Sequence, residues 1–276
     1  MNKKVLSIKG LTVRYGNGCA HCKSGGTLTK NRCPICGTVW ALSHADVDLY
    51  QGEILGIVGE SGSGKSTLMK SLYFDFDITS GECTIENYKE GKQNIFTESM
   101  QQKRYIKNNL MGMVYQNPVL GLRMNYSAAG NIAEKLIAAG RREFHPMTDR
   151  VKELLKSVDI LEERMKEPPK NFSGGMQQRV QISKALANNP EILLLDEVTT
   201  GLDLSVQAKV LDLIRRIRRD FGVSILLVSH DLAVIRMLAD RTIVLLDGNI
   251  IEQGLTDQIL DDPQHAYTQQ LVHSLI

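Results

Sequence analysis

The sequence predicts an α/β domain built around a parallel or mixed β-sheet. Apolar runs of strand length, Ile192–Leu195 and Val223–Ser229, alternate with helix-length stretches such as Leu204–Asp220. Asp46–Gly59 alternates apolar and polar residues and then becomes continuously apolar, as expected for a strand that enters a buried sheet. The 276 residues are 42% apolar and 23% charged, so the chain can bury a sizeable core.

The N-terminal part should contain short strands, an insert and then a helix. Val5–Ile8 and Leu11–Tyr15 are expected to be strands, and a cysteine-rich insert follows them. After the strand Asp46–Gly59, a helix should start at Gly64–Lys65. The polar stretch Glu86–Lys107 has poor periodicity and should form a loop and a short helix.

The middle of the chain predicts a helical subdomain, at about 117–172, within a single 1–276 domain. Asn125–Arg164 is rich in Ala, Leu, Glu and Lys at helical spacing, and "EPPKNF" then breaks the helix. The elements expected after that break are a helix Ser173–Asn188 stopped by Pro190, a helix Asp231–Ala239, and a hairpin of Arg241–Leu246 with Ile250–Gln253 around "DG".

Composition argues against several classes of protein. The net charge of +2 gives no global reason to expect nucleic acid or an anionic membrane as a partner. The apolar runs are far shorter than the roughly 20 residues that span a bilayer, and no long apolar stretch follows the charged N-terminus. Five cysteines, four of them in C-x-x-C pairs, favour reduced thiols and metal over disulfides. We therefore expect a cytoplasmic protein without a signal peptide.

The segment "GESGSGKST", Gly59–Thr67, matches the P-loop pattern G-x-x-x-x-G-K-[ST] between an expected strand and an expected helix. Its glycines let backbone N–H groups point inward, where they and the helix dipole can hold phosphates. Lys65 adds positive charge, and the Ser66 hydroxyl can bind Mg²⁺. The bland alternative is a glycine-rich turn before a helix. The candidate phosphate-site residues are Gly59, Ser61, Gly62, Gly64, Lys65, Ser66 and Thr67.

Two further segments fit the same chemistry. "ILLLDE" ends a buried strand with Asp196, which can hold Mg²⁺, and Glu197, which can orient an attacking water. "FSGGMQQR" begins a helix at Ser173, where capping and two glycines leave backbone donors for an anion. A chain with two phosphate-binding helix starts and a single strong P-loop suggests a site shared between two subunits.

With these motifs, the chain resembles the ATP-binding subunits of the ABC superfamily over nearly its whole length. Tyr15 matches the aromatic residue that stacks on adenine, Gln116 in "VYQNP" the glutamine next to the helical subdomain, and His230 in "VSHD" the γ-phosphate sensor. Val198 stands where the family usually has proline, which removes rigidity and no functional group. The remaining matched residues are the signature Ser173, Gly174, Gly175 and Gln177, the catalytic glutamate Glu197, and Asp203 in "TGLD".

The resemblance implies a mechanism. Two subunits face each other head to tail, and each ATP lies between the P-loop of one subunit and Ser173–Gly175 of the other. Mg²⁺ would be bound by Ser66, Gln116 and Asp196. Glu197 would polarise the attacking water, while Lys65 and His230 stabilise the developing charge. The homodimer closes on ATP and reopens after hydrolysis.

Other segments narrow the resemblance. Asn117–Leu136 and Gly254–Val272 are closely similar to the ATP-binding subunits of phosphonate carbon–phosphorus lyase systems. That similarity implies a role in phosphonate breakdown, in which ATP turnover remodels a complex of soluble lyase subunits. The alternative is an ATPase of a peptide- or nickel-type importer, whose membrane permease subunits would dock around Gln116–Arg123.

The insert "CAHCKSGGTLTKNRCPIC" has the spacing C-x₂-C-x₁₀-C-x₂-C, which fits two knuckles closing on one tetrahedral Zn²⁺. The alternatives are an iron–sulfur cluster, free thiols in a loop, or a redox dithiol. His21 is expected to face solvent, and Cys83 to be a small buried hydrophobe. The expected zinc ligands of this small ribbon are Cys19, Cys22, Cys33 and Cys36.

The purpose of the ribbon stays open between a structural or partner-docking role and a nucleic-acid contact. Lys23, Lys30 and Arg32 add positive charge, but four thiolates on Zn²⁺ leave the site itself negative. Interleaved aromatic residues for base stacking are missing from the segment, and Trp40 lies just beyond it. A nucleic-acid-associated ATPase is therefore the least favoured of the three interpretations.

Overall fold

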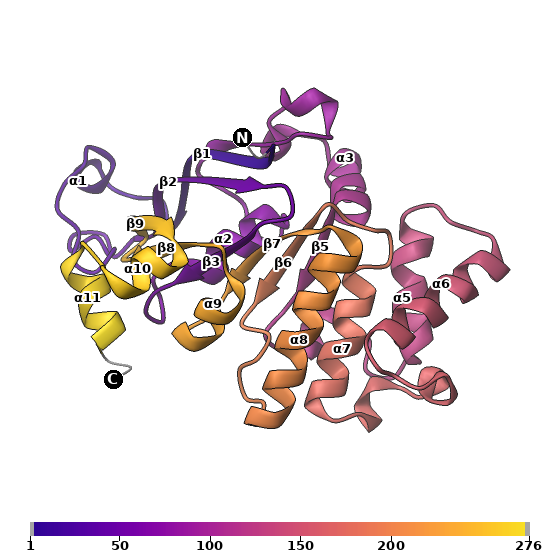
Figure 1. The fold of residues 1–276 in the computed structure, drawn as a ribbon. Helices are drawn as coiled ribbons and strands as arrows, with labels where there is room; N and C mark the ends of the chain where they lie inside the picture. Colours follow the sequence, from indigo (N-terminus) through magenta and orange to yellow (C-terminus); the bar gives the residue numbers. More distant parts are fainter. Residues whose placement is uncertain (1–2, 274–276) are drawn as a thin grey trace. The chain divides into compact units, whose positions relative to one another are not determined.

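The computed structural model describes residues 3–273. The described chain forms two compact units: residues 3–98 together with 228–273 form unit 1, and Ser99–Leu227 form unit 2. Figure 1 labels most of the helices and strands of both units. The α/β class predicted from the sequence is confirmed, because both units combine β-strands with helices.

Unit 1 contains a three-stranded antiparallel sheet with the order β2-β1-β4. Its strands are β1 (Lys4–Tyr15), β2 (Val39–Tyr50) and β4 (Ser80–Ile85). The two short N-terminal strands expected from the sequence are one strand. The pairing register shifts between Ile8 and Leu11, where Gly10 adopts a φ of 58°, so the irregularity that looked like a break is a bulge inside β1.

The other strands of unit 1 are β3 (Ile54–Val58), β8 (Arg241–Leu246) and β9 (Asn249–Leu255), with β8 parallel to β3 and antiparallel to β9. The single strand expected over Asp46–Gly59 is wrong, because β2 ends at Tyr50 and a turn precedes β3. The hairpin around "DG" is confirmed. Its turn residues Asp247 and Gly248 both have positive φ, 48° and 79°, as a two-residue hairpin turn requires.

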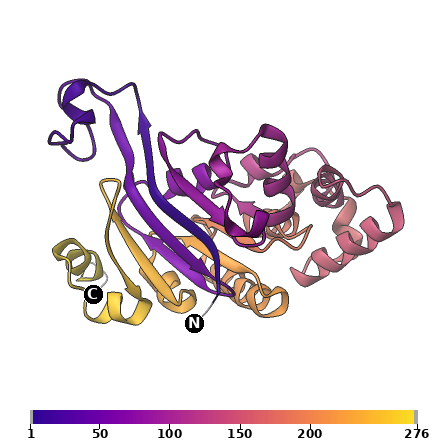
Figure 2. The ribbon, with the colours of Figure 1, turned by 90° about the horizontal axis from the view of Figure 1, so that it is seen from above.

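The cysteine insert lies at the tip of a long two-stranded ribbon. β1 leads into the insert and β2 leads out of it, and Tyr15 pairs with Val39 at its base. Figure 2 shows the insert at the end of this ribbon opposite to the start of β1. The helices of unit 1 are α1 (Ala20–Lys23), α2 (Lys65–Leu72), α9 (Leu232–Leu238), α10 (Thr256–Asp261) and α11 (Ala266–His273).

Unit 2 contains β5 (Met111–Val114), β6 (Ile192–Asp196) and most of β7 (Ser224–Val228) as neighbours in that order, with β5 parallel to β6. These strands are fully buried. The helices of unit 2 are α3 (Met100–Tyr105), α4 (Pro118–Gly121), α5 (Ala128–Ala138), α6 (Phe144–Ser157), α7 (Gly174–Ala185) and α8 (Leu204–Phe221).

The helical part of unit 2 agrees with the sequence. α5 contacts both α6 and α7, and Ile132, Leu154 and Ile182 are fully buried in these helices. The helix expected at Ser173–Asn188 is α7, and its start is fixed by the side chain of Ser173. Subdomain bounds of about 117–172 stay a prediction. Over the described chain, the helices are too short or too polar to cross a membrane.

Candidate nucleotide site and cysteine cluster

The P-loop of unit 1 connects β3 to α2 through glycines with left-handed backbone. Gly59 and Gly64 have φ values of 146° and 109°. A Cβ atom at Gly59 would lie 2.1 Å from the Leu245 carbonyl oxygen, and one at Gly64 would lie 2.3 Å from the Ala41 carbonyl oxygen. These positions therefore accept only glycine, and the loop is packed tightly on β8 and β2. Ser61 and Gly62, in the middle of the loop, are exposed.

Lys65 is 5% exposed and stabilises the curled shape of the loop. Its Nζ donates hydrogen bonds to the carbonyl oxygens of Gly59, at 2.8 Å, and Glu60, at 2.7 Å. Among the described residues, no side chain caps the N-terminus of α2, so its first backbone N–H groups can face an anion. Ser66 and Thr67 lie half-buried in the same first turn.

Tyr15 is oriented beside this turn. Its hydroxyl lies 3.2 Å from Thr67 Oγ1, and its ring meets the ring of Phe76 edge to face, with centroids 6.1 Å apart. The residue is 46% exposed, so the ring offers a free apolar surface.

His230 follows β7 and is exposed. Its two neighbours in the chain hold the backbone around it. The Ser229 N–H donates to the Ile57 carbonyl oxygen of β3, at 3.3 Å. The Asp231 carboxylate accepts from the Ala233 N–H, at 2.8 Å, and caps α9.

In unit 2, the acidic residue that ends β6 and the one that follows it are held differently. Asp196 is 4% exposed. Glu197 has a φ of 47°, in the left-handed region that side chains other than glycine seldom adopt. Its Oε2 accepts hydrogen bonds from Gln116 Nε2, at 3.0 Å, and from Thr200 Oγ1, at 3.2 Å. The structure thus brings Gln116 and Glu197 together, as two residues matched to the family motifs.

The signature segment forms the N-terminus of α7. Ser173 Oγ accepts a hydrogen bond from the Met176 N–H, at 3.4 Å. A Cβ atom at Gly175 would lie 2.4 Å from Val206 Cγ1, so the glycine permits close packing on α8. The amide of Gln177 donates to the carbonyl oxygens of Pro169 and Phe172, at 3.0 and 3.1 Å. Gln177 therefore binds the loop before α7 in this structure.

Asp203, the last residue of "TGLD", acts as the N-cap of α8. Its Oδ1 accepts hydrogen bonds from the Ser205 hydroxyl, at 2.7 Å, and from the Val206 N–H, at 3.0 Å. These bonds, led by that from Ser205, lower the pKa of the Asp203 carboxyl.

Two glutamines that the sequence reasoning did not single out hold the Gln116 segment. Gln181 is 1% exposed; it accepts from the Tyr115 N–H, at 2.8 Å, and donates to the Tyr115 carbonyl, at 3.0 Å. Gln178 donates to the Gln116 carbonyl, at 3.0 Å. Their spacing on one face of α7, in "QRVQ", is the signal that could have revealed them, because buried polar side chains need partners.

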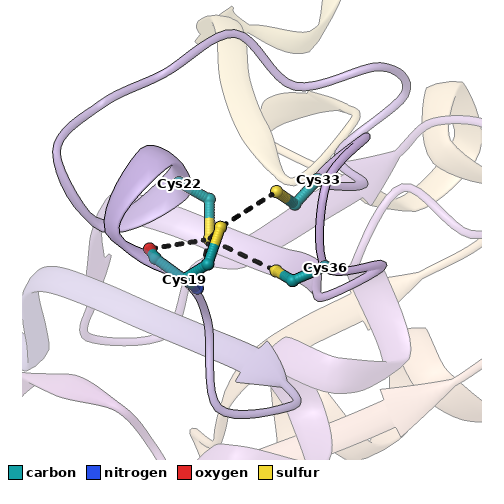
Figure 3. A group of neighbouring side chains, drawn as sticks. All are labelled: Cys19, Cys22, Cys33 and Cys36. Carbon is teal, nitrogen blue, oxygen red and sulfur yellow. Dashed lines mark hydrogen bonds between the residues drawn. The ribbon is translucent and has the colours of Figure 1, made fainter.

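The four cysteines of the insert converge, as Figure 3 shows. Their sulfur atoms all lie within 4.8 Å of one another. Cys19 Sγ is 3.9 Å from Cys22 Sγ and 3.7 Å from Cys33 Sγ, and Cys22 Sγ is 3.8 Å from Cys36 Sγ. In a tetrahedral zinc site with Zn–S bonds of about 2.3 Å, the sulfurs are about 3.8 Å apart. The donor set therefore fits a tetrahedral thiophilic ion.

Thr38 supports this cluster from the base of the insert. Its Oγ1 lies 3.3 Å from Cys36 Sγ. The hydrogen bond with the Thr38 hydroxyl is the main cause that lowers the pKa of the Cys36 thiol to about 6. His21 is not simply solvent-facing as expected. It is half-buried, because its ring lies against Gly26, where a Cβ atom would come within 2.4 Å. The expectation for Cys83 is confirmed, since it is fully buried.

Comparisons with known proteins agree with this geometry. A family model described as ABC transporter matches residues 42–200. The chain is 40% identical to PhnK of Escherichia coli strain K12, named as an ATP-binding protein of phosphonates utilization, over 100% of this chain and 99% of PhnK. It is 35% identical to the oligopeptide transport ATP-binding protein OppF of Lactococcus lactis subsp. lactis strain IL1403, over 87% of this chain and 74% of OppF.

A dimeric ATP-binding cassette in a post-hydrolysis state, bound to ADP and phosphate, has a TM-score of 0.75 and 28% identity, covering 91% of this chain and 98% of the cassette. A P-loop, an acidic pair at the end of a buried strand and a signature helix define an ATP-hydrolysing cassette. The chain belongs to the ABC transporter family, and it is an ATP hydrolase. ATP and Mg²⁺ are the expected substrate and cofactor of such an enzyme, and the dimeric cassettes are consistent with a homodimer.

Proposed function

We propose that this chain is the ATP-hydrolysing subunit of a phosphonate carbon–phosphorus lyase system and works in the cytoplasm. Closure and reopening of its homodimer would remodel a complex of soluble lyase subunits. The observation that carries the proposal is the likeness to PhnK, which extends over the full length of both chains. The likeness to OppF, in contrast, leaves about a quarter of OppF unmatched.

In this proposal, each residue has a distinct role in ATP turnover. The P-loop amides and Lys65 bind the phosphates, and the exposed ring of Tyr15 stacks on adenine. Glu197 accepts a proton from the attacking water, and the bond from Gln116 supports its orientation. The other proposed roles are Mg²⁺ binding by Ser66, Asp196 and Gln116, charge stabilisation by His230, and phosphate and dimer contacts from the partner through Ser173, Gly174, Gly175, Gln177 and Asp203.

We also propose that Cys19, Cys22, Cys33 and Cys36 bind one structural Zn²⁺. The sulfur spacing supports this ion, and so does the lack of any other core in the insert. Between Gly16 and Thr38, which enclose the insert, only Cys22, Cys33 and Thr38 are buried. A segment with so little apolar burial needs a cross-link such as a disulfide or a structural metal to hold one conformation, and these four cysteines form no disulfide.

The test is an affinity capture of tagged Glu197→Gln protein with ATP and Mg²⁺ from its own cells. This variant should bind ATP and form a dimer that cannot reopen, because the base for water attack is missing. Mass spectrometry of the eluate should identify soluble lyase subunits. Elemental analysis should give one zinc ion per copy of this chain. A parallel capture with Lys65→Ala, which should not close on ATP, is the matched control.

The second candidate is the ATPase of a peptide importer, which the likeness to OppF favours. Membrane permease subunits in the Glu197→Gln eluate, and absent from the Lys65→Ala eluate, would replace the phosphonate proposal with this one. A growth experiment distinguishes the lyase-system proposal from the importer proposal independently of the capture. A deletion strain should lose growth on a phosphonate as its phosphorus source and keep growth on inorganic phosphate.

A further inference from the structure

We propose that Thr38 is a positioning residue through which the metal-bound cysteine cluster holds Tyr15 in place for ATP. The inference rests on the proposed roles of Tyr15 and of the zinc site, and it gives the cysteine insert a purpose in nucleotide binding. Thr38 is 4% exposed and lies one residue before the start of β2.

The first link joins Thr38 to the cluster. Its carbonyl oxygen accepts a hydrogen bond from the Cys33 N–H, at 2.8 Å, and its Oγ1 lies 3.3 Å from Cys36 Sγ. When Cys36 is a metal-bound thiolate, the Thr38 hydroxyl donates its proton to that sulfur. One residue thus contacts both cysteines of the second knuckle.

The second link joins Thr38 to the segment that follows Tyr15. The Gly18 N–H donates to Thr38 Oγ1, at 3.1 Å, which the hydroxyl can accept while donating to Cys36. A Cβ atom at Gly16 would lie 2.9 Å from the same oxygen, so the Tyr15 segment runs directly over Thr38. Thr38 therefore connects the two sides of the ribbon at the point where Tyr15 leaves β1.

Tyr15 relies on this connection because its other contacts are exposed or lie at strand ends. It is the last residue of β1, and its pairing partner Val39 is the first residue of β2. Its hydroxyl contact with Thr67 is exposed, and its ring meets Phe76, which is itself 38% exposed. Without metal, the 23 residues Gly16–Thr38 would form a long loop with little apolar burial. Such a loop would not hold Gly18 against Thr38, and Tyr15 would lose its fixed orientation.

The phosphate side of the site has separate support. Gly64 packs on the Ala41 carbonyl, and the Gly248 N–H donates to the Ser63 carbonyl, at 3.1 Å. Loss of the metal should therefore weaken contacts to adenine and leave the contacts to phosphate. ATP should bind more weakly, while inorganic tripolyphosphate, which has no base, should bind as before.

The experiment measures zinc content, affinity for ATP and affinity for tripolyphosphate on the full chain by titration calorimetry. Removal of zinc with a chelator that spares Mg²⁺ should raise the Kd for ATP about tenfold, within the usual range of coupling between two sites. Thr38→Val should keep one zinc per chain and raise the Kd for ATP similarly. Thr38→Ser, which keeps the hydroxyl, should restore the affinity. The KM for ATP should rise while kcat holds.

The outcomes separate this inference from the functions on which it rests. If Tyr15→Ala leaves the Kd for ATP unchanged, the proposed role of Tyr15 itself is wrong. If Tyr15→Ala weakens ATP binding, but zinc removal and Thr38→Val do not, the coupling through Thr38 is wrong. An equal loss of tripolyphosphate affinity would also overturn it, because the cluster would then support the whole fold of the site. Protein without zinc would contradict the metal site directly.

Discussion

At the scale of single residues, Glu197 has a backbone conformation that is unfavourable in free energy unless its surroundings stabilise it. Glu197 adopts a left-handed conformation at the end of β6, where the following residues form a turn and Thr200 bonds back to its carboxylate. Such a conformation costs on the order of 1 kcal/mol or more and persists only when its surroundings fix it. The carboxylate is thereby aimed at Gln116, whose amide donates a hydrogen bond to it.

Lys135 is a second residue in a costly state, since it is 7% exposed and its amine donates to the Lys107 carbonyl. Burial, aided by the charges of Lys107 and Lys184, lowers the pKa of Lys135 to about 7. Between this pKa and the ordinary value of 10.5, the unfolded chain holds a proton that the folded chain lacks. The free energy of unfolding of the parent protein should therefore rise with pH across this window.

Lys135→Met removes the titration and keeps the length of the side chain. The free energy of unfolding of the variant minus that of the parent should be larger at pH 6 than at pH 9.5. The change should be roughly 1.4 kcal/mol for each pH unit of this interval that lies above the folded-state pKa of Lys135. Urea unfolding at both pH values measures it, with Lys209→Met on the exposed surface of α8 as the control. A pH-independent gap would show that Lys135 is charged in the folded protein.

At the scale of elements, α7 carries the signature at its N-terminus and also holds the segment that contains Gln116. Its N-terminus presents Ser173 and the glycines, and about one and two turns further Gln178 and Gln181 hold the backbone of Gln116 and Tyr115. We therefore expect the Gln116 segment to move with α7. A change in the contacts of the signature should then reach Gln116, and through it Glu197, by hydrogen bonds within unit 2.

Gln181→Ala should break this connection. The Tyr115 N–H and carbonyl would lose their buried partners, which costs about 1 to 3 kcal/mol of folding free energy. ATP hydrolysis should fall more than ATP binding, because Gln116 no longer orients Glu197. Urea unfolding and steady-state kinetics on one preparation measure both effects. Gln101→Ala, at an exposed position of α3, should change neither. Full activity in a destabilised Gln181→Ala protein would mean that α7 supports only the fold.

The elements also show which features a sequence can reveal. The P-loop, the start of α7 and the hairpin turn at Asp247–Gly248 were predicted because each depends on a few adjacent residues. β4 ("SGECTI") and β5 ("MGMV") were missed, since they are short, contain glycine and lack a strand period. Contacts between distant segments, such as those of Thr38 with Gly18 and of Gln181 with Tyr115, leave no local pattern.

At the scale of the whole molecule, the single chain carries a P-loop and a signature helix, and two solved structures of a similar ATP-binding cassette are dimers. If each ATP is held by Lys65 of one subunit and Ser173 of the other, two different defects should compensate in a mixed dimer. A dimer of Lys65→Ala with Ser173→Arg would have one site with both defects and one site with neither, by its two-fold symmetry.

We expect each variant alone to retain no ATP and the mixed dimer to retain a single ATP. Both variants should carry Glu197→Gln, so that retention requires closure and not turnover. Two different affinity tags isolate the mixed dimer in sequence, and the bound nucleotide is then counted. Two copies of Lys65→Ala with different tags form the control and should retain none. If isolated mixed dimers also retain none, the site does not draw on both subunits. In that case Ser173 would serve only to cap α7, a role that its bond to the Met176 N–H already fulfils.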